Sequence, residues 1–178
     1  RLRSDADELS TLLVDLLGLA RLDAEQVELR RDAIPLGDLV EELTTQLAPL
    51  ARERGLELVA VPAALFARAD LARTRQVLRA LVDNALVYAR SKVRLEVVRG
   101  EHRACLRVCD DGPGIAADDQ PHIFERFYRA DASRTREGRG GAGLGLAIAS
   151  ELVRRMGGEL RVESSPEGAV FTVALPPA

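Results

Sequence analysis

Apolar side chains near the start of the chain recur at helical spacing. Steps of four and three residues alternate along Leu2, Ala6, Leu9, Leu13, Leu16 and Ala20. This seam predicts a long N-terminal helix, and further leucines between these positions widen its apolar face. A wide face needs partner helices, so a four-helix bundle is favoured over a helix packed on its own domain. Residues 23–32 would then form a polar connector.

The middle of the chain alternates between helical and strand patterns. Val27 and Leu29 alternate with charged residues and are compatible with a short edge strand. Helical periodicity predicts a helix from Pro35 to Gly55 and a second, long helix that Asp70 could cap at its N-terminus. Strands are predicted over residues 56–61, 66–69, 92–97 and 104–108, with a turn at 100–103.

The last third of the chain begins with a sharp break at residues 110–114, where two glycines flank a proline. After it we predict a short helical piece near residues 118–127, a helix over 144–156, and strands over 159–163 and 170–175. Helices and strands therefore alternate unevenly, without a regular βαβ repeat. This favours an α+β fold: a two-layer α/β sandwich in which helices cover one face of a mixed, mostly antiparallel sheet.

Composition narrows the class of protein. The chain has 178 residues, of which 47% are hydrophobic and 30% charged, as in a soluble domain with a substantial core. The net charge of -3 gives no reason to expect nucleic acid as a partner. Cys105 and Cys109 are expected to be reduced, buried side chains. There is no signal peptide and no run of about 18 apolar residues, so we do not expect this segment to span a membrane.

A glycine-rich stretch precedes the predicted helix at residues 144–156. Five glycines fall within residues 138–145. Glycine lets a ligand approach the backbone, and free amides at a helix start suit a phosphate chain. The alternative is a flexible loop without a ligand. The stretch is not a P-loop, because no Gly-Lys-Ser/Thr follows, and its GxGxG spacing is a poor dinucleotide fingerprint.

Other polar positions could complete a nucleotide site. Asn84 lies within an apolar helical pattern, where its amide is either a structural group or a neutral ligand for Mg²⁺. Asp110 ends an apolar strand, where it belongs either to an ordinary Asp-Gly turn or to a site that accepts a hydrogen bond from an exocyclic amine. Asp111 is compatible with such a turn. The Arg-rich residues 129–140 form either a phosphate-binding lid or a solvated segment.

In this order the segments resemble the catalytic, ATP-binding part of bacterial sensor histidine kinases, within the wider group of gyrase-type, chaperone and mismatch-repair ATPases. The resemblance covers about residues 34–176, and its F box favours histidine kinases over the rest of the group. The matching motifs are Leu81-Val82-Asp83-Asn84-Ala85 (N box), Asp110-Asp111-Gly112-Pro113-Gly114-Ile115 (first glycine box), Ile123-Phe124-Glu125-Arg126-Phe127-Tyr128-Arg129 (F box) and Gly141-Ala142-Gly143-Leu144-Gly145-Leu146 (second glycine box).

The resemblance implies a Bergerat-type ATP-binding fold over residues 31–178. Residues 1–30 would be the second helix of the dimerisation and phosphoacceptor hairpin and its connector. The phosphorylated histidine would then lie ahead of Arg1, because His102 and His122 are expected to be ordinary surface residues.

The resemblance also implies roles for single residues. Asn84 would ligate Mg²⁺ and, together with Arg129 near the phosphates, act in catalysis. Asp110 would bind the amine of adenine. Further contacts to ATP would come from Tyr88, Gly112, Gly114, Ile115, Gly141, Gly143, Leu144 and Gly145.

The implied function is that of the catalytic core of a two-component sensor histidine kinase. It would bind ATP and Mg²⁺ and transfer the γ-phosphoryl group to a histidine of the hairpin, for relay to an aspartate of a response regulator. The implied partners are the response regulator, the kinase's own phosphoacceptor helix and a second copy bound through the helical bundle. The segment would be cytoplasmic, in a sensor of the inner membrane, and would not phosphorylate itself.

Two positions depart from the family pattern. Ala80 stands where a second Asn is frequent, and Val87 where Lys or Arg commonly reaches the phosphates. Each loss would weaken nucleotide binding by on the order of 1–3 kcal/mol. Compensating cations could come from Arg134, Arg136 or Arg139. The departures motivate a rival function, a nucleotide-sensing regulatory module with little kinase activity. A chaperone-type ATPase is disfavoured by the F box and the short chain.

Overall fold

The computed structural model describes residues 28–129 and 143–178, together with four helical residues near the N-terminus: Leu13, Leu16, Leu17 and Ala20. Most of the predicted N-terminal helix, Val27 and the predicted lid lie outside the described residues. Within the described parts of the chain, no helix combines the length and the apolar character that crossing a bilayer would require.

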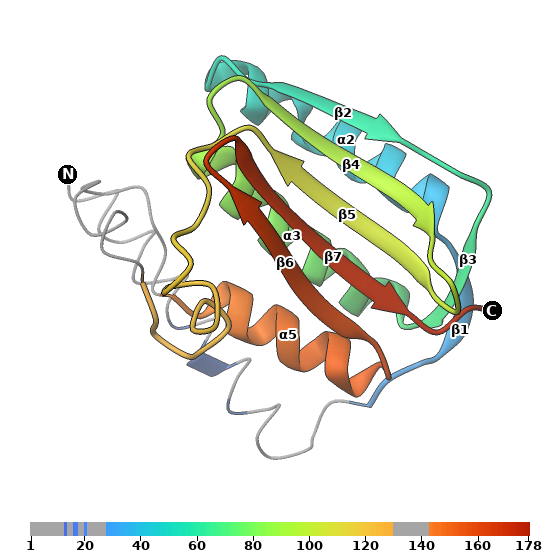
Figure 1. Ribbon diagram of the computed structural model, residues 1–178. Helices are drawn as coiled ribbons and strands as arrows, with labels where there is room; N and C mark the ends of the chain where they lie inside the picture. The colour runs from blue at the N-terminus through green and yellow to red at the C-terminus, as the bar shows by residue number, and fades with distance from the viewer. Residues whose placement is uncertain (1–12, 14–15, 18–19, 21–27, 130–142) are drawn as a thin grey trace.

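A mixed sheet forms one layer of the molecule and helices form the other (Figure 1). Its five strands occur in the order β2 (Glu57–Val61), β4 (Lys92–Arg99), β5 (Ala104–Asp110), β7 (Gly168–Leu175) and β6 (Glu159–Ser165). β2 and β4 are parallel, and the other neighbours are antiparallel. A separate two-stranded sheet joins β1 (Asp32–Pro35) to β3 (Phe66–Ala69).

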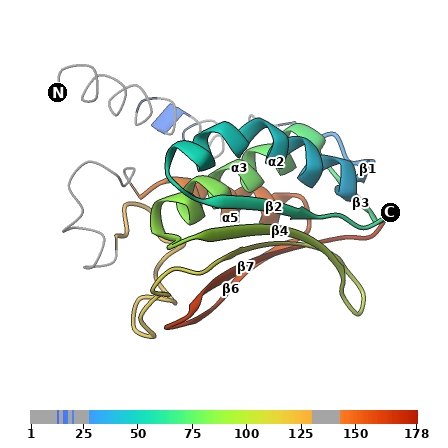
Figure 2. The same ribbon diagram turned by 90° about the horizontal axis from the view of Figure 1, so that it is seen from above.

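Helices α2 (Leu36–Glu53), α3 (Leu71–Tyr88) and α5 (Gly145–Arg155) cover the same face of the five-stranded sheet, which Figure 2 shows edge-on. The two-layer α/β sandwich predicted from the sequence is therefore confirmed. Local chemistry explains the helix ends. Asp70 accepts a hydrogen bond from the amide of Arg73 at 3.0 Å and so caps α3. Gly55, with φ +71°, follows the end of α2.

The core lies between the two layers. Alternate residues of each strand point toward the helices, and Leu95, Leu106 and Phe171 are fully buried there. They pack against the apolar faces of α2, α3 and α5. Each such side chain contributes about 1.5–3 kcal/mol by leaving water, so this interface holds the sandwich together. Cys105 and Cys109 are free thiols, both buried as expected, and lie among the strand positions that point away from the core.

Two predicted elements are wrong. Leu29 is not part of a strand, and Val27 lies outside the described residues; the strand in this region is β1, because the backbone of residues 32–35 finds its pairing partner in β3. The short helical piece near residues 118–127 is a series of turns. The amide of His122 bonds to the carbonyl of Asp119, three residues back, and Phe127 takes a positive φ of 63°, which a helix does not allow.

A long stretch of chain separates β5 from its neighbour β7. β5 and β7 are neighbours in the sheet, with Asp110 opposite Ala169. The glycine box at 110–115, the F box, the described part of the second glycine box and α5 all belong to the chain between these two strands (Figure 1). The predicted site is thus built on one side of a continuous sheet, at the end where β5 stops.

Candidate functional site

Helix α3 carries Asn84 between the two glycine segments. Ala80, Asn84 and Tyr88 follow one another at intervals of four residues and so share a helix face. At one end of this row, the methyl group of Ala80 lies 4.0 Å from the place a Cβ would take on Gly145. At the other end, the carbonyl oxygen of Tyr88 lies 2.7 Å from the corresponding place on Gly112. Asn84 is half-buried midway between them.

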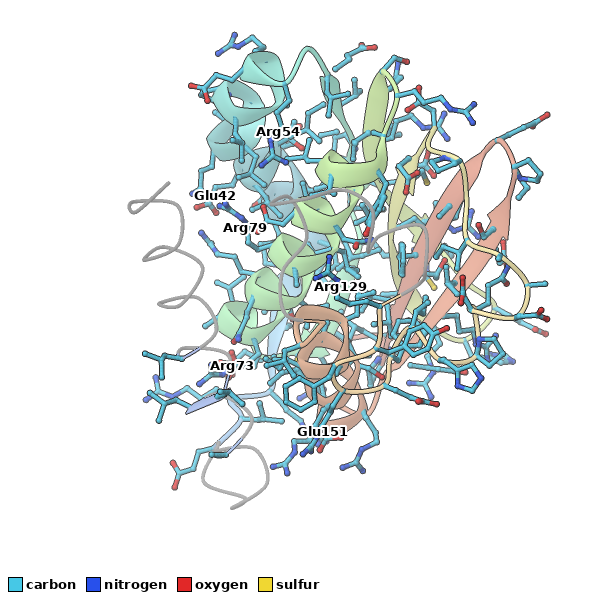
Figure 3. The ribbon with its side chains drawn as sticks, turned by 90° about the vertical axis from the view of Figure 1, so that its left-hand side faces the viewer. Glu42, Arg54, Arg73, Arg79, Arg129 and Glu151 are labelled. Atoms are coloured by element: carbon cyan, nitrogen blue, oxygen red, sulfur yellow. The ribbon has the colours of Figure 1, made fainter. Side chains whose placement is uncertain are left out.

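Asp83, the neighbour of Asn84, is turned outward. Its carboxylate pairs with Arg79 one turn earlier at 2.8 Å, and both side chains are about half exposed. Arg79 lies at the surface of the helix layer (Figure 3). Asp83 is thus a surface acid, whereas Asn84 is the half-buried polar group of the neighbouring helix face.

The carboxylate of Asp110, at the end of β5, is oriented by hydrogen bonds from the backbone. Its Oδ1 accepts a hydrogen bond from the amide of Gly112 at 2.8 Å. Burial raises the pKa of Asp110 above its ordinary value, and the bonds from the backbone of Gly112 and Ala169 only partly oppose that effect. A carboxylate can accept more than the bonds from these two amides. The arrangement therefore suits recognition of a further N–H donor, as an adenine amine would supply.

Asp111 has a structural role that the sequence did not indicate. Its carboxylate accepts hydrogen bonds from the amides of Arg90, Ser91 and Lys92 at 2.8, 3.0 and 3.1 Å and from the Ser91 hydroxyl at 2.5 Å. Burial acts to raise its pKa, but these bonds outweigh it and hold the pKa well below the usual range. Asp111 thereby ties the chain after α3 to the end of β5, rather than only forming an Asp-Gly turn.

The first glycine box also rests against the β6–β7 hairpin. Gly114 has φ +75°, and a Cβ on it would lie 1.9 Å from the carbonyl oxygen of Ser165. Only glycine fits this close approach. The amide of Ile115 donates to the hydroxyl of Ser164 at 2.7 Å. The sequence predicted the two strands of this hairpin but did not indicate that the hairpin forms a wall of the site.

The F box joins the second glycine box. The amide of Phe127 donates to the carbonyl oxygen of Gly143 at 3.0 Å, and Gly143 has φ +75°. Tyr128 donates through its hydroxyl to Asp119 at 2.5 Å, which braces the turns of the F box. Arg129 follows, and its side chain lies between the ribbons of α3 and α5 in the view of Figure 3.

The second glycine box leads into α5. The backbone amides at the start of an α-helix have no partner within the helix, so they are available to an anion. Leu144 is fully buried, so its backbone rather than its side chain could face a ligand. Gly141 lies outside the described residues, as do Arg134, Arg136 and Arg139. The structure thus brings Asn84, Tyr88, the first glycine box and Gly145 together around one end of α3.

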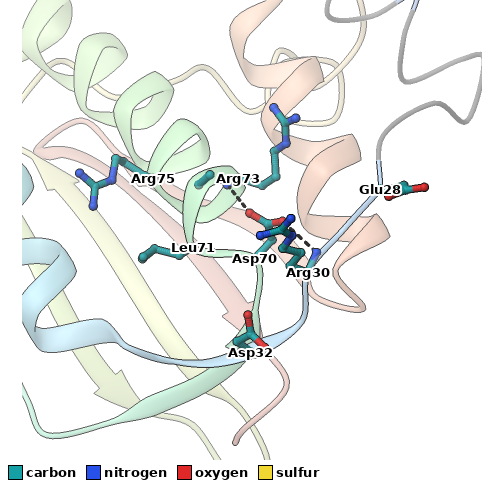
Figure 4. Close-up of a pocket in the computed structure, with 8 residues that line it drawn as sticks. Glu28, Arg30, Asp32, Asp70, Leu71, Arg73 and Arg75 are labelled. Carbon is teal, nitrogen blue, oxygen red and sulfur yellow. Dashed lines mark hydrogen bonds between the residues drawn. The ribbon is translucent and has the colours of Figure 1, made fainter.

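A separate cavity lies at the opposite end of α3 (Figure 4). Asp70 is buried there and accepts a second hydrogen bond, from the amide of Arg30 at 2.9 Å. Arg31 donates from Nη2 to the carbonyl oxygen of Arg155, at the end of α5, at 2.6 Å. This region holds residues 28–31 against the domain and contains none of the predicted site residues.

Comparison with known proteins identifies the class to which this fold and site belong. Residues 69–178 match the family described as histidine kinase-, DNA gyrase B- and HSP90-like ATPase. The chain belongs to this ATPase family.

The relatives narrow the class further. The signal transduction histidine-protein kinase AfsQ2 of Streptomyces coelicolor is 40% identical over 174 residues, covering 97% of this chain and 31% of AfsQ2. The sensor histidine kinase MtrB of Mycobacterium tuberculosis is 39% identical over 177 residues, with the same coverage of 97% and 31%. The chain thus spans about a third of the length of these curated relatives.

A solved structure of full-length ShkA in complex with AMPPNP superposes with a TM-score of 0.85 at 33% identity, over 99% of this chain and 37% of that chain. The resemblance to sensor histidine kinases is confirmed by these matches in both sequence and structure.

Proposed function

We propose that this chain is the catalytic core of a two-component sensor histidine kinase, which binds ATP with Mg²⁺ and transfers the γ-phosphoryl group to a histidine of the dimerisation hairpin. The observation that carries the proposal is the position of Asn84, between Gly112 of the first glycine box and Gly145 of the second. The family match supports it, as does the AMPPNP complex of ShkA, a protein of similar fold.

The described residues fit the two groups that this function requires. The half-buried, oriented carboxylate of Asp110 would accept a hydrogen bond from the adenine amine. The free amides at the start of α5 would bind phosphate oxygens. Asn84 offers a neutral oxygen, which suits Mg²⁺ because this ion is held by few protein ligands beside phosphates and water. When bound, Mg²⁺ would neutralise charge on the phosphates.

Phosphoryl transfer needs positioning and charge stabilisation more than a protein nucleophile. Arg129, at the start of the segment between the F box and α5, would add positive charge near the phosphates. The two histidines of the chain are unsuited as acceptors. His102 is exposed in the turn before β5, at the end of that strand opposite Asp110, and His122 pairs with Glu125 at 2.7 Å. The acceptor would therefore belong to the hairpin, and a response regulator aspartate would receive the group next.

The test is a titration of the chain with a labelled ATP analogue, with and without Mg²⁺. We expect Mg²⁺ to tighten binding in the wild type and to have little effect in Asn84→Ala. Asp83→Ala is the matched control, because its side chain leaves the same helix toward solvent. Robust incorporation of labelled phosphate into this chain alone would contradict the proposed acceptor.

The rival function is a nucleotide-sensing regulatory module with little kinase activity. It is favoured by Ala80 and Val87, which stand where the family often places a further amide and a cation. Nucleotide would then only bias docking of the domain on its helical bundle. If neither Mg²⁺ nor Asn84→Ala changed the affinity for the ATP analogue, the result would support this rival over the kinase.

A further inference from the structure

The β6–β7 hairpin brings a serine into register with the carboxylate proposed to bind adenine. Ser164 on β6 pairs with Ala169 on β7, and Ala169 pairs with Asp110 on β5. Residues directly opposite one another in a sheet point to the same face. Ala169 is buried on the face that the helices cover. Ser164 and Asp110 therefore emerge on that same face, two strands or about 10 Å apart.

The hydroxyl of Ser164 connects two segments of the site. It accepts a hydrogen bond from the amide of Ile115 at 2.7 Å and donates to the carbonyl oxygen of Gly168 at 3.3 Å. The first glycine box is consequently held at both ends: Asp110 continues β5, and Ile115 is attached to β6. Ser164 is half-buried, so water competes only partly for these bonds.

The backbone around this bond leaves little space for rearrangement. A Cβ on Gly168 would lie 2.0 Å from the carbonyl oxygen of Asp110. A Cβ on Gly114 would lie 1.9 Å from the carbonyl oxygen of Ser165. The glycine box and the hairpin thus pack backbone against backbone. A displacement of Ile115 would be passed along this short loop to Gly112, whose amide orients the Asp110 carboxylate.

We infer that Ser164 is a positioning residue for the purine ring: its hydroxyl holds the first glycine box at the distance from Asp110 that the base requires. This inference rests on the proposed binding of ATP. Ser164 lies outside the four sequence motifs, and it acts through Ile115 and the loop rather than by touching the phosphates.

The experiment compares the binding of two nucleotides to the wild type and to two variants. ATP and purine riboside triphosphate, which lacks the 6-amino group, are titrated against wild type, Ser164→Ala and Ser164→Thr. We expect Ser164→Ala to raise the Kd for ATP roughly five- to tenfold, as loss of one hydrogen bond would. The affinity for purine riboside triphosphate should fall less, because this analogue has no amino group to bond to Asp110. Ser164→Thr keeps the hydroxyl and should restore both the affinity and the preference for ATP.

Thr172→Ala is the control, because it removes a hydroxyl from β7 at a position that alternates with the buried Phe171 and Val173 and so lies on the uncovered face of the sheet. An unchanged Kd for ATP in Ser164→Ala would overturn the inference. If Ser164→Ala weakened the binding of both nucleotides equally and also lowered the Tm, Ser164 would be a structural residue only, and the inference would again be overturned. A wild type that binds no ATP would instead refute the proposed function.

Hydrogen exchange in the wild type tests the same bond without a substitution. We expect the amide of Ile115 to exchange slowly in the absence of nucleotide, because Ser164 already holds it. Exchange as fast as that of an unbonded loop amide, with protection appearing only when ATP is added, would show that the nucleotide and not the serine orders the loop.

Discussion

The amide of Phe127 donates to the carbonyl oxygen of Gly143 at 3.0 Å, and this bond joins the two ends of the segment that contains residues 128–142. Phe127 makes this contact although it adopts an unfavourable positive φ of 63° and is 59% exposed. A non-glycine residue keeps such a conformation only when its surroundings enforce it. The F box and the described part of the second glycine box therefore form one structural unit.

Replacing Gly143 by alanine should break this unit. Gly143 has φ +75°, and a Cβ there would lie 2.7 Å from the carbonyl oxygen of Tyr128. We expect Gly143→Ala to lower the free energy of unfolding by about 2 kcal/mol, the sum of left-handed strain and the displaced carbonyl. Gly145→Ala is the comparison, because its nearest neighbour is 4.0 Å away, and it should change stability by less than about 0.5 kcal/mol. Urea denaturation of both variants would decide; equal losses would contradict the explanation.

Asp110→Asn should stabilise the fold while it removes nucleotide binding. Burial raises the pKa of Asp110, so the folded chain binds this proton more tightly than the unfolded chain does. The ionised carboxylate therefore costs stability at neutral pH, and the cost disappears as the pH falls through the folded pKa toward the unfolded value of 3.8. We expect a higher Tm for Asp110→Asn at pH 7, with the difference from wild type closing toward pH 4.

Binding should move in the opposite direction. An Asn amide would turn a donor toward the adenine amine, so ATP affinity should fall roughly tenfold or more. Thermal melts across pH and an ATP titration at pH 7 measure both effects. Lower stability at neutral pH, or retained affinity, would show that the carboxylate serves the fold rather than the ligand.

Asp70 caps α3 and also bonds to the backbone of residues 28–31, and two substitutions distinguish these two interactions. Serine is also a good N-cap, but its side chain is too short to replace the bond to the amide of Arg30. Asp70→Ser should therefore keep the amide of Arg73 protected from hydrogen exchange and expose that of Arg30. Asp70→Ala should expose both and cost about 1 kcal/mol more than serine. Protection of Arg30 in Asp70→Ser would contradict this division.

The contribution of Asp70 to stability should also depend on pH. Burial acts to raise the pKa of Asp70, but hydrogen bonds from the amides of Arg73 and Arg30 outweigh it and lower the pKa below 3.8. Its contribution to stability is thus complete above the unfolded pKa and is lost as the pH falls through the folded pKa. The stability difference between wild type and Asp70→Ser should shrink in acid, as denaturation at pH 7 and pH 3 would show.

Ala80→Asn should strengthen metal-dependent binding. Ala80 lies one turn before Asn84 on the face of α3 that passes Gly145. A second amide oxygen there would join Asn84 near the metal, and we expect the Kd for ATP with Mg²⁺ to fall by up to roughly tenfold. Without Mg²⁺ no change is expected. Ala72→Asn, the same substitution at an exposed position of α3, is the control, and metal-independent tightening would refute the interpretation.

Local chemistry made much of the fold predictable. The cap at Asp70 and the glycine after α2 each act within a few residues, and the structure places these helix ends where the sequence predicts them. The sheet with helices on one face followed from the same patterns. The region of turns around His122 was mistaken for a helix, because Phe127 adopts a positive φ that only its contact with Gly143 explains.

The candidate site was predictable only in part, for a similar reason. Asn84 was recognisable as a polar residue within an apolar helical pattern, and Asp110 as one at the end of an apolar strand. The bonds of Asp111 to residues 90–92 and of Ser164 to Ile115 depend on strand register and connect positions far apart in sequence. An isolated sequence does not specify such contacts. The predicted roles of Gly141 and the arginines near it concern residues that the structure does not describe.

The adjacency of β5 and β7 has a consequence for how this molecule could change over evolutionary time. The chain leaves the sheet after β5, re-enters it at the edge as β6 and returns beside β5 as β7, so the ends of the long excursion are fixed by backbone pairing in the sheet. Doubling the length of a closed loop costs only about 0.6 kcal/mol. Insertions and deletions between Arg129 and Gly143 can therefore be tolerated at little cost to the fold, because the bond from Phe127 to Gly143 joins the flanks of that segment. New specificities can arise there while residues 110–115, which pack closely on the β6–β7 hairpin, are inherited unaltered.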